Sequence, residues 1–179
     1  MITDYKTYRD YCSADKFANK ITRPFFVLSP SWTYLKCLRK VELLMSLVEK
    51  HRFLFPLLLI SKYHLRRWSL KTGITLPPRT FGKGLYIPHY GSIVVNHTAH
   101  FGDYCVIQNG VNISEGVIGE NHIYIGAGAK LLSDVYIASD VIIGANAVVT
   151  KSIQEHNIVV AGIPAKKISD RGFKNRTKV

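Results

Sequence analysis

Small or aliphatic residues recur at every sixth position from residue 87 to residue 164. When this segment is cut into thirteen hexads, the first position is small or aliphatic in all thirteen, and the third is apolar or glycine in eleven. The exceptions in the third position, His89 and Glu155, lie near the two ends. A helix cannot keep a period of six, and stacked hairpins would need turn insertions. The period predicts a β-helix of hexapeptide repeats, in which three short strands form a coil of about eighteen residues.

The residues between the predicted strands are of types that tolerate unusual backbone angles at corners. They are Gly102, Asp103, Asn109, Gly110, Gly126, Gly128, Asp134, Asp140, Gly144 and Asn146. Residues about eighteen apart should stack, which gives one column of Gln108, Gly126, Gly144 and Gly162 and a second of Asn109, Ala127, Ala145 and Ile163. Such a column leaves room for an extended ligand and exposes backbone N–H and C=O groups to it. The alternative is that glycine and alanine only serve the corners.

The N-terminal part of the chain has a helical pattern instead. Apolar residues over 31–53 follow helical spacing, and Ser31 is expected to cap the start of that helix. A second helix is expected over 61–73, with Gly73 as the residue that ends it. Pro56 predicts a break or kink between the two helices.

The apolar run FLFPLLLI (53–60) has eight residues, whereas about 20 are needed to cross a bilayer. Leu58, Leu59 and Ile60 are expected to be buried in the core or against another subunit. The alternative is that this basic, partly apolar region rests on a membrane surface. Residues 1–16 are too polar and charged for a signal peptide.

The formal net charge of +12 comes partly from basic residues in 62–71 and in the C-terminal tail. This charge is compatible with binding to a nucleic acid, a membrane surface or a polyanionic ligand such as a nucleotide. The alternative is a basic surface that is simply solvated. No nucleic-acid-binding module is recognisable, so no nucleic-acid partner is expected. The cysteines, Cys12, Cys37 and Cys105, are odd in number and far apart. This pattern argues against a disulfide framework and a zinc site and favours the cytoplasm.

Three segments, IGAGAK (125–130), IGANAVV (143–149) and VVAGIPAKKI (159–168), resemble the left-handed β-helix acyltransferases of the hexapeptide-repeat superfamily. The segment KTGITLPPRTFGKGLYIPHYGSIVVN (71–96) is similar to the serine acetyltransferase branch, which includes small relatives that O-acetylate polysaccharide units. The resemblance covers about residues 70–170. It implies a left-handed coil, a homotrimer, and acetyl-CoA bound without a metal between neighbouring coils.

The predicted organisation is therefore mainly β. An α-helical region over 1–72 precedes a left-handed β-helix acyltransferase domain over 73–168, and a basic tail follows over 169–179.

The resemblance assigns a catalytic role to His89, which stands before SIVV where the superfamily has a histidine before a GIVV-like segment. Imidazole can take the proton of an attacking hydroxyl and return it to the leaving thiolate. His89 is also expected in an inward third position, and the alternative is that an end coil is simply more exposed. His97 and His100 occupy outward positions, where exposed or interface side chains are expected. His97 and Asn109 are the candidate acceptor-binding residues, because a trimer can bring one protomer's side chain to its neighbour's substrate.

The same resemblance places the pantetheine arm of the cofactor along the backbone of Ala127 and Ala145, and the stacked column adds Gly126 and Gly144 as candidate contacts. It places Lys166 and Lys167 near the adenine and the 3′-phosphate, as candidates for an ion pair with the phosphate. The remaining alternative is that the small residues contribute only to packing.

Two departures from the serine acetyltransferase pattern stand out. Thr75 and Pro88 occupy positions where that branch has aspartates, so the usual orienting carboxylate is missing; Asp103 and Glu115 are weak substitutes. The hexads also run through 111–122 without the inserted glycine-rich loop that helps to hold the amino acid.

The leading hypothesis is an acetyl-CoA-dependent O-acetyltransferase that acts on a saccharide hydroxyl in capsule or surface-polysaccharide assembly. It would work in the cytoplasm, with possible peripheral contact at the inner face of the membrane. The alternative is a serine O-acetyltransferase. Further alternatives are a non-catalytic hexapeptide-repeat scaffold and a hydratase, which needs three imidazoles converging on zinc.

Overall fold

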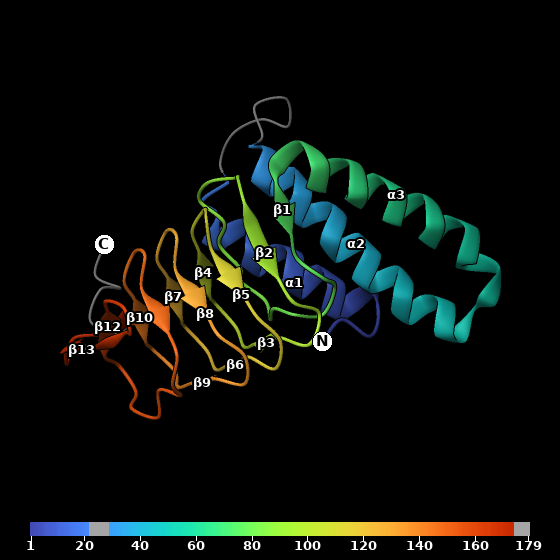
Figure 1. The fold of residues 1–179 in the computed structure, drawn as a ribbon. Helices are drawn as coiled ribbons and strands as arrows, with labels where there is room; N and C mark the ends of the chain where they lie inside the picture. Colours follow the sequence, from blue (N-terminus) through green and yellow to red (C-terminus); the bar gives the residue numbers. More distant parts are fainter. Residues whose placement is uncertain (22–28, 174–179) are drawn as a thin grey trace.

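The computed structural model describes residues 1–21 and 29–173 and consists of helices packed on one end of a parallel β-helix (Figure 1). The helices are α1 (Tyr5–Ala18), α2 (Pro30–Lys50), the 3-10 helix η2 (Arg52–Leu54) and α3 (Phe55–Thr72). Part of the predicted basic tail, residues 174–179, lies outside the described residues. Whether 1–72, 73–168 and 169–179 are separate units stays a prediction.

Three sheets form the sides of the β-helix. Sheet A contains β1 (Ile74–Thr75), β2 (Ile93–Val95), β5 (Asn112–Ile113), β8 (Lys130–Leu131) and β11 (Val148–Val149). Sheet B contains β3 (His100–Phe101), β6 (Ile118–Gly119) and β9 (Tyr136–Ile137). Sheet C contains β4 (Val106–Ile107), β7 (Tyr124–Ile125), β10 (Ile142–Ile143), β12 (Val159–Ala161) and β13 (Lys166–Ser169).

The strand register confirms the predicted coil length over 93–149. Val94 pairs with Asn112, Asn112 with Lys130, and Lys130 with Val148, so each step spans eighteen residues. The first and third hexad positions of this stretch form the core, and all of them are buried. Stacked coils bury these columns against one another, which is why the period of six persists through the sequence.

The register shifts in the first coil, and this shift corrects the predicted position of His89. Tyr86 pairs with Val106, twenty residues later, because two extra residues lie between Tyr86 and Ile93. Ile87 therefore fills the inward third position and is buried, whereas His89 is exposed. The prediction that His89 points inward is wrong, because the hexad count does not register an insertion.

A second register shift lies at the other end of the β-helix. Ile153 pairs with Ile137, sixteen residues before it, and takes the third position expected for the exposed Glu155. Ile143 pairs with Val160, seventeen residues later. Ala161, rather than the predicted Gly162, therefore stacks on Gly144 in the first column. In the second column the predicted last residue, Ile163, is shifted by one position in the same way.

The helices close the N-terminal end of the β-helix. Trp32, Tyr34, Leu35 and Leu38 of α2 belong to the same buried cluster as Ile74, Leu76, Phe81 and Leu85 of the first coil. The Tyr34 hydroxyl donates to the carbonyl of Leu76 at 3.1 Å and accepts from its N–H at 2.9 Å. The unpaired end of a solenoid core is thus covered by an apolar helix face.

A buried ion network joins α1, α2 and the first coil. The Arg39 guanidinium contacts Asp15 at 2.7 Å and Glu42 at 3.0 Å, and it also donates to the carbonyls of Phe81 and Gly82. Burial alone would lower the pKa of Arg39, but Glu42 and Asp15 outweigh that effect and raise it. Burial raises the pKa of Asp15, and the charge of Arg39 opposes the rise. Arg39 therefore stays protonated as the counter-ion of two buried carboxyl groups.

The helix predictions are confirmed in part. Gly73 adopts a left-handed conformation (φ 67°) at the end of α3, and the break falls at 51–54, just before Pro56 in the first turn of α3. Ser29, not Ser31, caps α2 by accepting from the Trp32 N–H at 3.2 Å. The cap lies earlier than expected because the proline at the start of α2 is itself helical.

Leu58 is buried against α2, as predicted, but Leu59 and Ile60 are exposed in the single chain. No helix in the described part of the chain has the length and apolar character needed to span a membrane.

Gly126 lies close to the backbone of the next coil. A β-carbon at this position would lie 2.6 Å from the Ala145 nitrogen and 2.7 Å from the Ile143 oxygen. We expect Gly126→Ala to lower the free energy of unfolding by about 1–3 kcal/mol, because the backbone of the next coil would have to move. Urea denaturation measures this effect. Ala145→Ser, at an exposed site in the corresponding corner of the next coil, should leave the midpoint unchanged, and equal effects would contradict the steric argument.

Candidate active site

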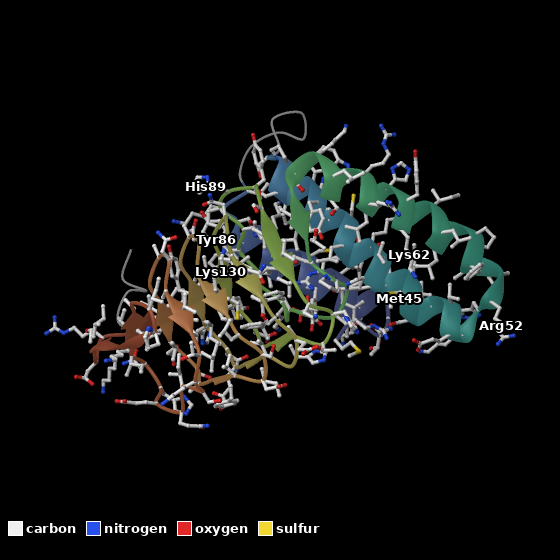
Figure 2. The ribbon with its side chains drawn as sticks, viewed as in Figure 1. Met45, Arg52, Lys62, Tyr86, His89 and Lys130 are labelled. Carbon is white, nitrogen blue, oxygen red and sulfur yellow. The ribbon has the colours of Figure 1, made fainter. Side chains whose placement is uncertain are left out.

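His89 lies at the corner where the first coil passes from sheet C to sheet A. The later coils have their C–A corners at 108–111, 126–129 and 144–147. The Gly110 N–H donates to the Gly91 carbonyl at 3.3 Å, so the His89 corner stacks directly on the next one. Figure 2 shows His89 at the edge of the first coil. The structure thus brings His89 to the head of the column that the sequence predicts as a cofactor groove.

The C-terminal end of α1 holds the segment that leads to His89. Asp15 accepts a hydrogen bond from the Leu85 N–H at 2.9 Å. The Asn19 side chain donates to the Leu85 carbonyl at 2.8 Å and accepts from the Ile87 N–H at 3.4 Å. The sequence analysis missed Asn19, because nothing local indicates a contact with residues more than sixty positions away. These contacts fix the backbone two residues before His89.

No orienting carboxylate contacts His89 in residues 1–21 and 29–173. Among the described residues, His89 forms no hydrogen bond or ion pair. Asp103 lies at a B–C corner, where it accepts from the Lys83 N–H at 3.0 Å, and Glu115 lies at an A–B corner. Neither substitute is at the His89 corner, and no other described residue takes the place of the missing aspartates.

The C–A corners present a row of unpaired backbone donors. The N–H groups of Asn109, Ala127 and Ala145 donate no hydrogen bond within residues 1–21 and 29–173. The carbonyls of Asn109 and Ala127 are occupied by the N–H groups of Gly128 (2.9 Å) and Asn146 (2.8 Å). An extended ligand with amide carbonyls can accept from such a row.

The predicted contact residues differ in exposure. Ala145 is exposed and Ala127 and Gly144 are half-buried, whereas Gly126 is buried under the next coil. Gly126 thus contributes to packing between coils, and the neighbouring residues supply the backbone N–H groups that remain unpaired.

The two lysines near the end of the column differ in their partners. Lys167 pairs with Asp170 at 2.5 Å and also with Glu155, and these hydrogen bonds raise its pKa. Lys166 is exposed and has no ion pair in the described part of the chain. It lies beside Ala161, the residue stacked on Gly144. Of the two lysines, Lys166 is therefore the one without an ion-pair partner among the described residues.

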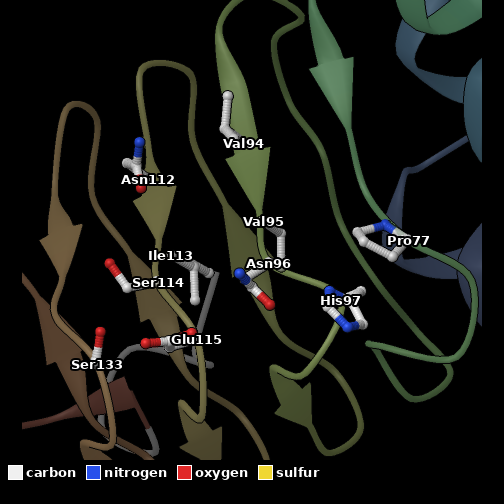
Figure 3. A pocket seen from close by; sticks show the side chains of 10 residues that line it. All are labelled: Pro77, Val94, Val95, Asn96, His97, Asn112, Ile113, Ser114, Glu115 and Ser133. Atoms are coloured by element: carbon white, nitrogen blue, oxygen red, sulfur yellow. The ribbon is translucent and has the colours of Figure 1, made fainter.

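His97 lies at an A–B corner, at the other end of β2 from His89. It lines a groove of about 580 Å³ on the outer side of sheet A (Figure 3). The groove is lined by Pro77, Val94, Val95, Asn96, His97, Asn112, Ile113, Ser114, Glu115 and Ser133. Asn109 is at a C–A corner, so one chain does not bring the two predicted acceptor-binding residues together.

No group of three or more histidine, cysteine, aspartate or glutamate side chains that could hold a metal occurs in the described residues. Cys12, Cys37 and Cys105 are unpaired, and burial raises the pKa of the Cys105 thiol to about 12.

Curated relatives of the chain are serine acetyltransferases. The one from Synechococcus elongatus is 35% identical over 122 residues, which cover 62% of this chain and 48% of the relative. The one from Mycobacterium tuberculosis is 36% identical over 106 residues, which cover 54% of this chain and 46% of the relative. The chain thus spans about half the length of the curated relatives it matches. A comparison with models of known protein families finds no match.

Solved structures of serine acetyltransferases have the same fold. The structure from Brucella abortus in complex with coenzyme A has a TM-score of 0.73 at 24% identity and covers 94% of this chain and 70% of its own. The soybean enzyme complexed with serine has a TM-score of 0.71 at 20% identity, with 91% and 70% covered. The chain has the left-handed β-helix fold of these structures.

These comparisons confirm the predicted fold and the resemblance to the serine acetyltransferase branch. They do not support the saccharide acceptor. The relatives' names agree better with the alternative, serine.

Proposed function

We propose that the chain is an acetyl-CoA-dependent O-acetyltransferase and that serine is its acceptor. The observation that carries the proposal is the position of His89 at the head of the column of unpaired N–H groups. Relatives named serine acetyltransferase support both the reaction and the acceptor. Because the chain spans about half of those relatives, its activity has to be tested directly.

In this proposal, His89 acts as the general base. It accepts the proton of the serine hydroxyl while the hydroxyl oxygen attacks the thioester carbon, and it returns that proton to the leaving thiolate. The products are O-acetylserine and free coenzyme A, so the step needs no other reactant. The N–H groups of Asn109, Ala127 and Ala145 donate to the amide carbonyls of the pantetheine arm and hold the thioester at the His89 corner.

Lys166 is proposed to bind the 3′-phosphate of the cofactor. We expect Lys166→Ala to raise the KM for acetyl-CoA about tenfold at unchanged kcat, because a charge-assisted hydrogen bond is lost. Lys167→Ala is the matched control and should have a smaller effect, since Lys167 is already paired. The difference between Lys166→Ala and the original chain should disappear with acetyl-dephospho-CoA. Equal KM effects of both substitutions would contradict the assignment.

A homotrimer is part of the proposal. Val94, Ile118 and Leu132 are exposed apolar side chains on sheets A and B and at an A–B corner, where a neighbouring protomer can cover them. Association through this side would bring the groove that contains His97 to the His89 corner of a neighbour. That arrangement gives His97 its proposed acceptor-binding role and lets a neighbour supply the group that orients His89.

A saccharide acceptor is the second candidate, and one observation favours it. Strands β5, β6 and β7 follow one another every six residues, so no loop is inserted between these coils to enclose an amino acid. The groove on sheet A is instead open and lined by Asn96, Asn112, Ser114 and Ser133. Hydroxyl and amide groups of this kind suit several sugar hydroxyls.

Release of free thiol from acetyl-CoA distinguishes the candidates. Release with serine, but not with a panel of sugars, supports the proposal. Release only with a sugar shows that the chemistry is right and the acceptor is wrong. If no acceptor causes thiol release and calorimetry detects no coenzyme A binding, the proposal is overturned in favour of a non-catalytic scaffold.

A further inference from the structure

The hairpin of α2 and α3 has an exposed apolar surface that neither the β-helix nor α2 covers. We define the α3 surface as the exposed apolar side chains Phe53, Phe55, Leu57, Leu59, Ile60, Tyr63 and Leu70. The opposite side of α3, with Leu58, Ser61 and Thr72, is buried. Figure 1 shows that the hairpin extends away from the β-helix, with its tip at the η2 segment. A concentration of exposed apolar side chains of this kind is typical of an interaction site.

The charged side chains within residues 50–72 are all positive. Residues 50–72 contain six lysines and arginines and no aspartate or glutamate. Lys62, Arg66 and Arg67 are exposed and form no ion pair in the part of the chain that the structure describes. Figure 2 shows Arg52 at the tip of the hairpin. The apolar tip is thus followed along α3 by unpaired positive charge.

We propose that the α3 surface binds the surface of a lipid bilayer that contains anionic lipids. Phe53 and Phe55 enter the boundary between headgroups and acyl chains, and the basic side chains of α3 lie among the headgroups. Anionic lipid complements the charge of 50–72, whereas a second copy of the same surface would bring like charges together. No described helix combines the length and the apolar character needed to span the bilayer, so the proposed contact is peripheral. The proposal does not depend on the acetyl-transfer reaction.

Sedimentation of the full chain with vesicles tests the proposal. We expect binding to vesicles of phosphatidylcholine mixed with phosphatidylglycerol and much weaker binding to phosphatidylcholine alone. Replacing Lys62, Arg66 and Arg67 together with glutamine should lower partitioning about a hundredfold, since each basic residue near an anionic surface contributes about fivefold. The double change Phe53→Ser and Phe55→Ser should lower it at least about tenfold.

Matched controls separate the α3 surface from general charge and hydrophobicity. Phe17→Ser removes an aromatic side chain on α1 that is 82% exposed, and Lys151→Gln removes an exposed charge on the β-helix; both should bind like the original chain. Equal binding to both kinds of vesicle, or no binding, would overturn the proposal. Sedimentation velocity without vesicles provides a further test. If the Phe53→Ser/Phe55→Ser variant formed a smaller oligomer than the original chain, the α3 surface would join copies of the chain, and the proposal would be overturned.

Discussion

Replacing His89 with alanine should lower kcat for acetyl transfer about 10²–10⁴-fold, the usual contribution of a positioned general base. His89 is exposed and makes no hydrogen bond in the described residues, so its removal should leave the unfolding midpoint unchanged. Acetyl-CoA binding by calorimetry should also persist, because the donors of the C–A corners are backbone groups. Initial rates of thiol release with serine measure the effect.

His97→Ala and His100→Ala are the matched controls for this experiment. Both imidazoles are exposed and lie away from the C–A corners. In the proposed trimer, His97→Ala should mainly raise the KM for serine, and His100→Ala should change neither constant. Losses of kcat equal to that of His89→Ala would show that the base is assigned to the wrong residue.

Replacing Arg39 with methionine should lower the free energy of unfolding by about 3–5 kcal/mol. Methionine fills much of the space, but Asp15 and Glu42 lose the charge that they face at 2.7 and 3.0 Å. A buried carboxylate without a counter-ion must be protonated or hydrated, and both cost free energy. Urea denaturation measures the loss, which is a large part of the stability of a typical domain.

Two further variants test the cause of this loss. Adding Asp15→Asn and Glu42→Gln to Arg39→Met should restore part of the stability, because the amide oxygens can still accept from the Leu85 and Arg79 N–H groups. Lys83→Met removes an exposed ion pair with Asp10 and should leave the midpoint almost unchanged. If the triple variant were no more stable than Arg39→Met alone, lost packing rather than unpaired charge would be the cause.

The central coils could be predicted from the sequence because the period of six reflects burial directly. Every inward residue of 93–149 contacts the equivalent residues of its neighbouring coils, so each position is restricted in size and polarity. The end coils contact helices or a terminal strand instead, and insertions and deletions are tolerated there. The apparent breaks in the column at His89 and Glu155 were therefore changes of register, with Ile87 and Ile153 in the inward positions.

Only part of the candidate site could be predicted, because some of its contacts depend on packing between distant segments. His89 and the small residues of the C–A corners are marked by local motifs. The contacts of Asn19 with Leu85 and Ile87 depend on how α1 packs, and no local pattern encodes that packing. The pairing of Lys167 with Glu155 and Asp170, which leaves Lys166 free, depends in the same way on β13 folding back beside β12.

The spacing of the coils gives the chain a fixed length scale. Neighbouring parallel strands lie about 4.8 Å apart, so three steps separate the corner of His89 from that of Ala145 by about 14 Å. Under the proposed function, an elongated thioester lies along this edge, and its length has to match this span. Duplication or loss of one coil would displace Lys166 from His89 by roughly 5 Å while leaving every strand pairing intact. Under the proposed function, the number of coils between His89 and Lys166 therefore determines which donor fits.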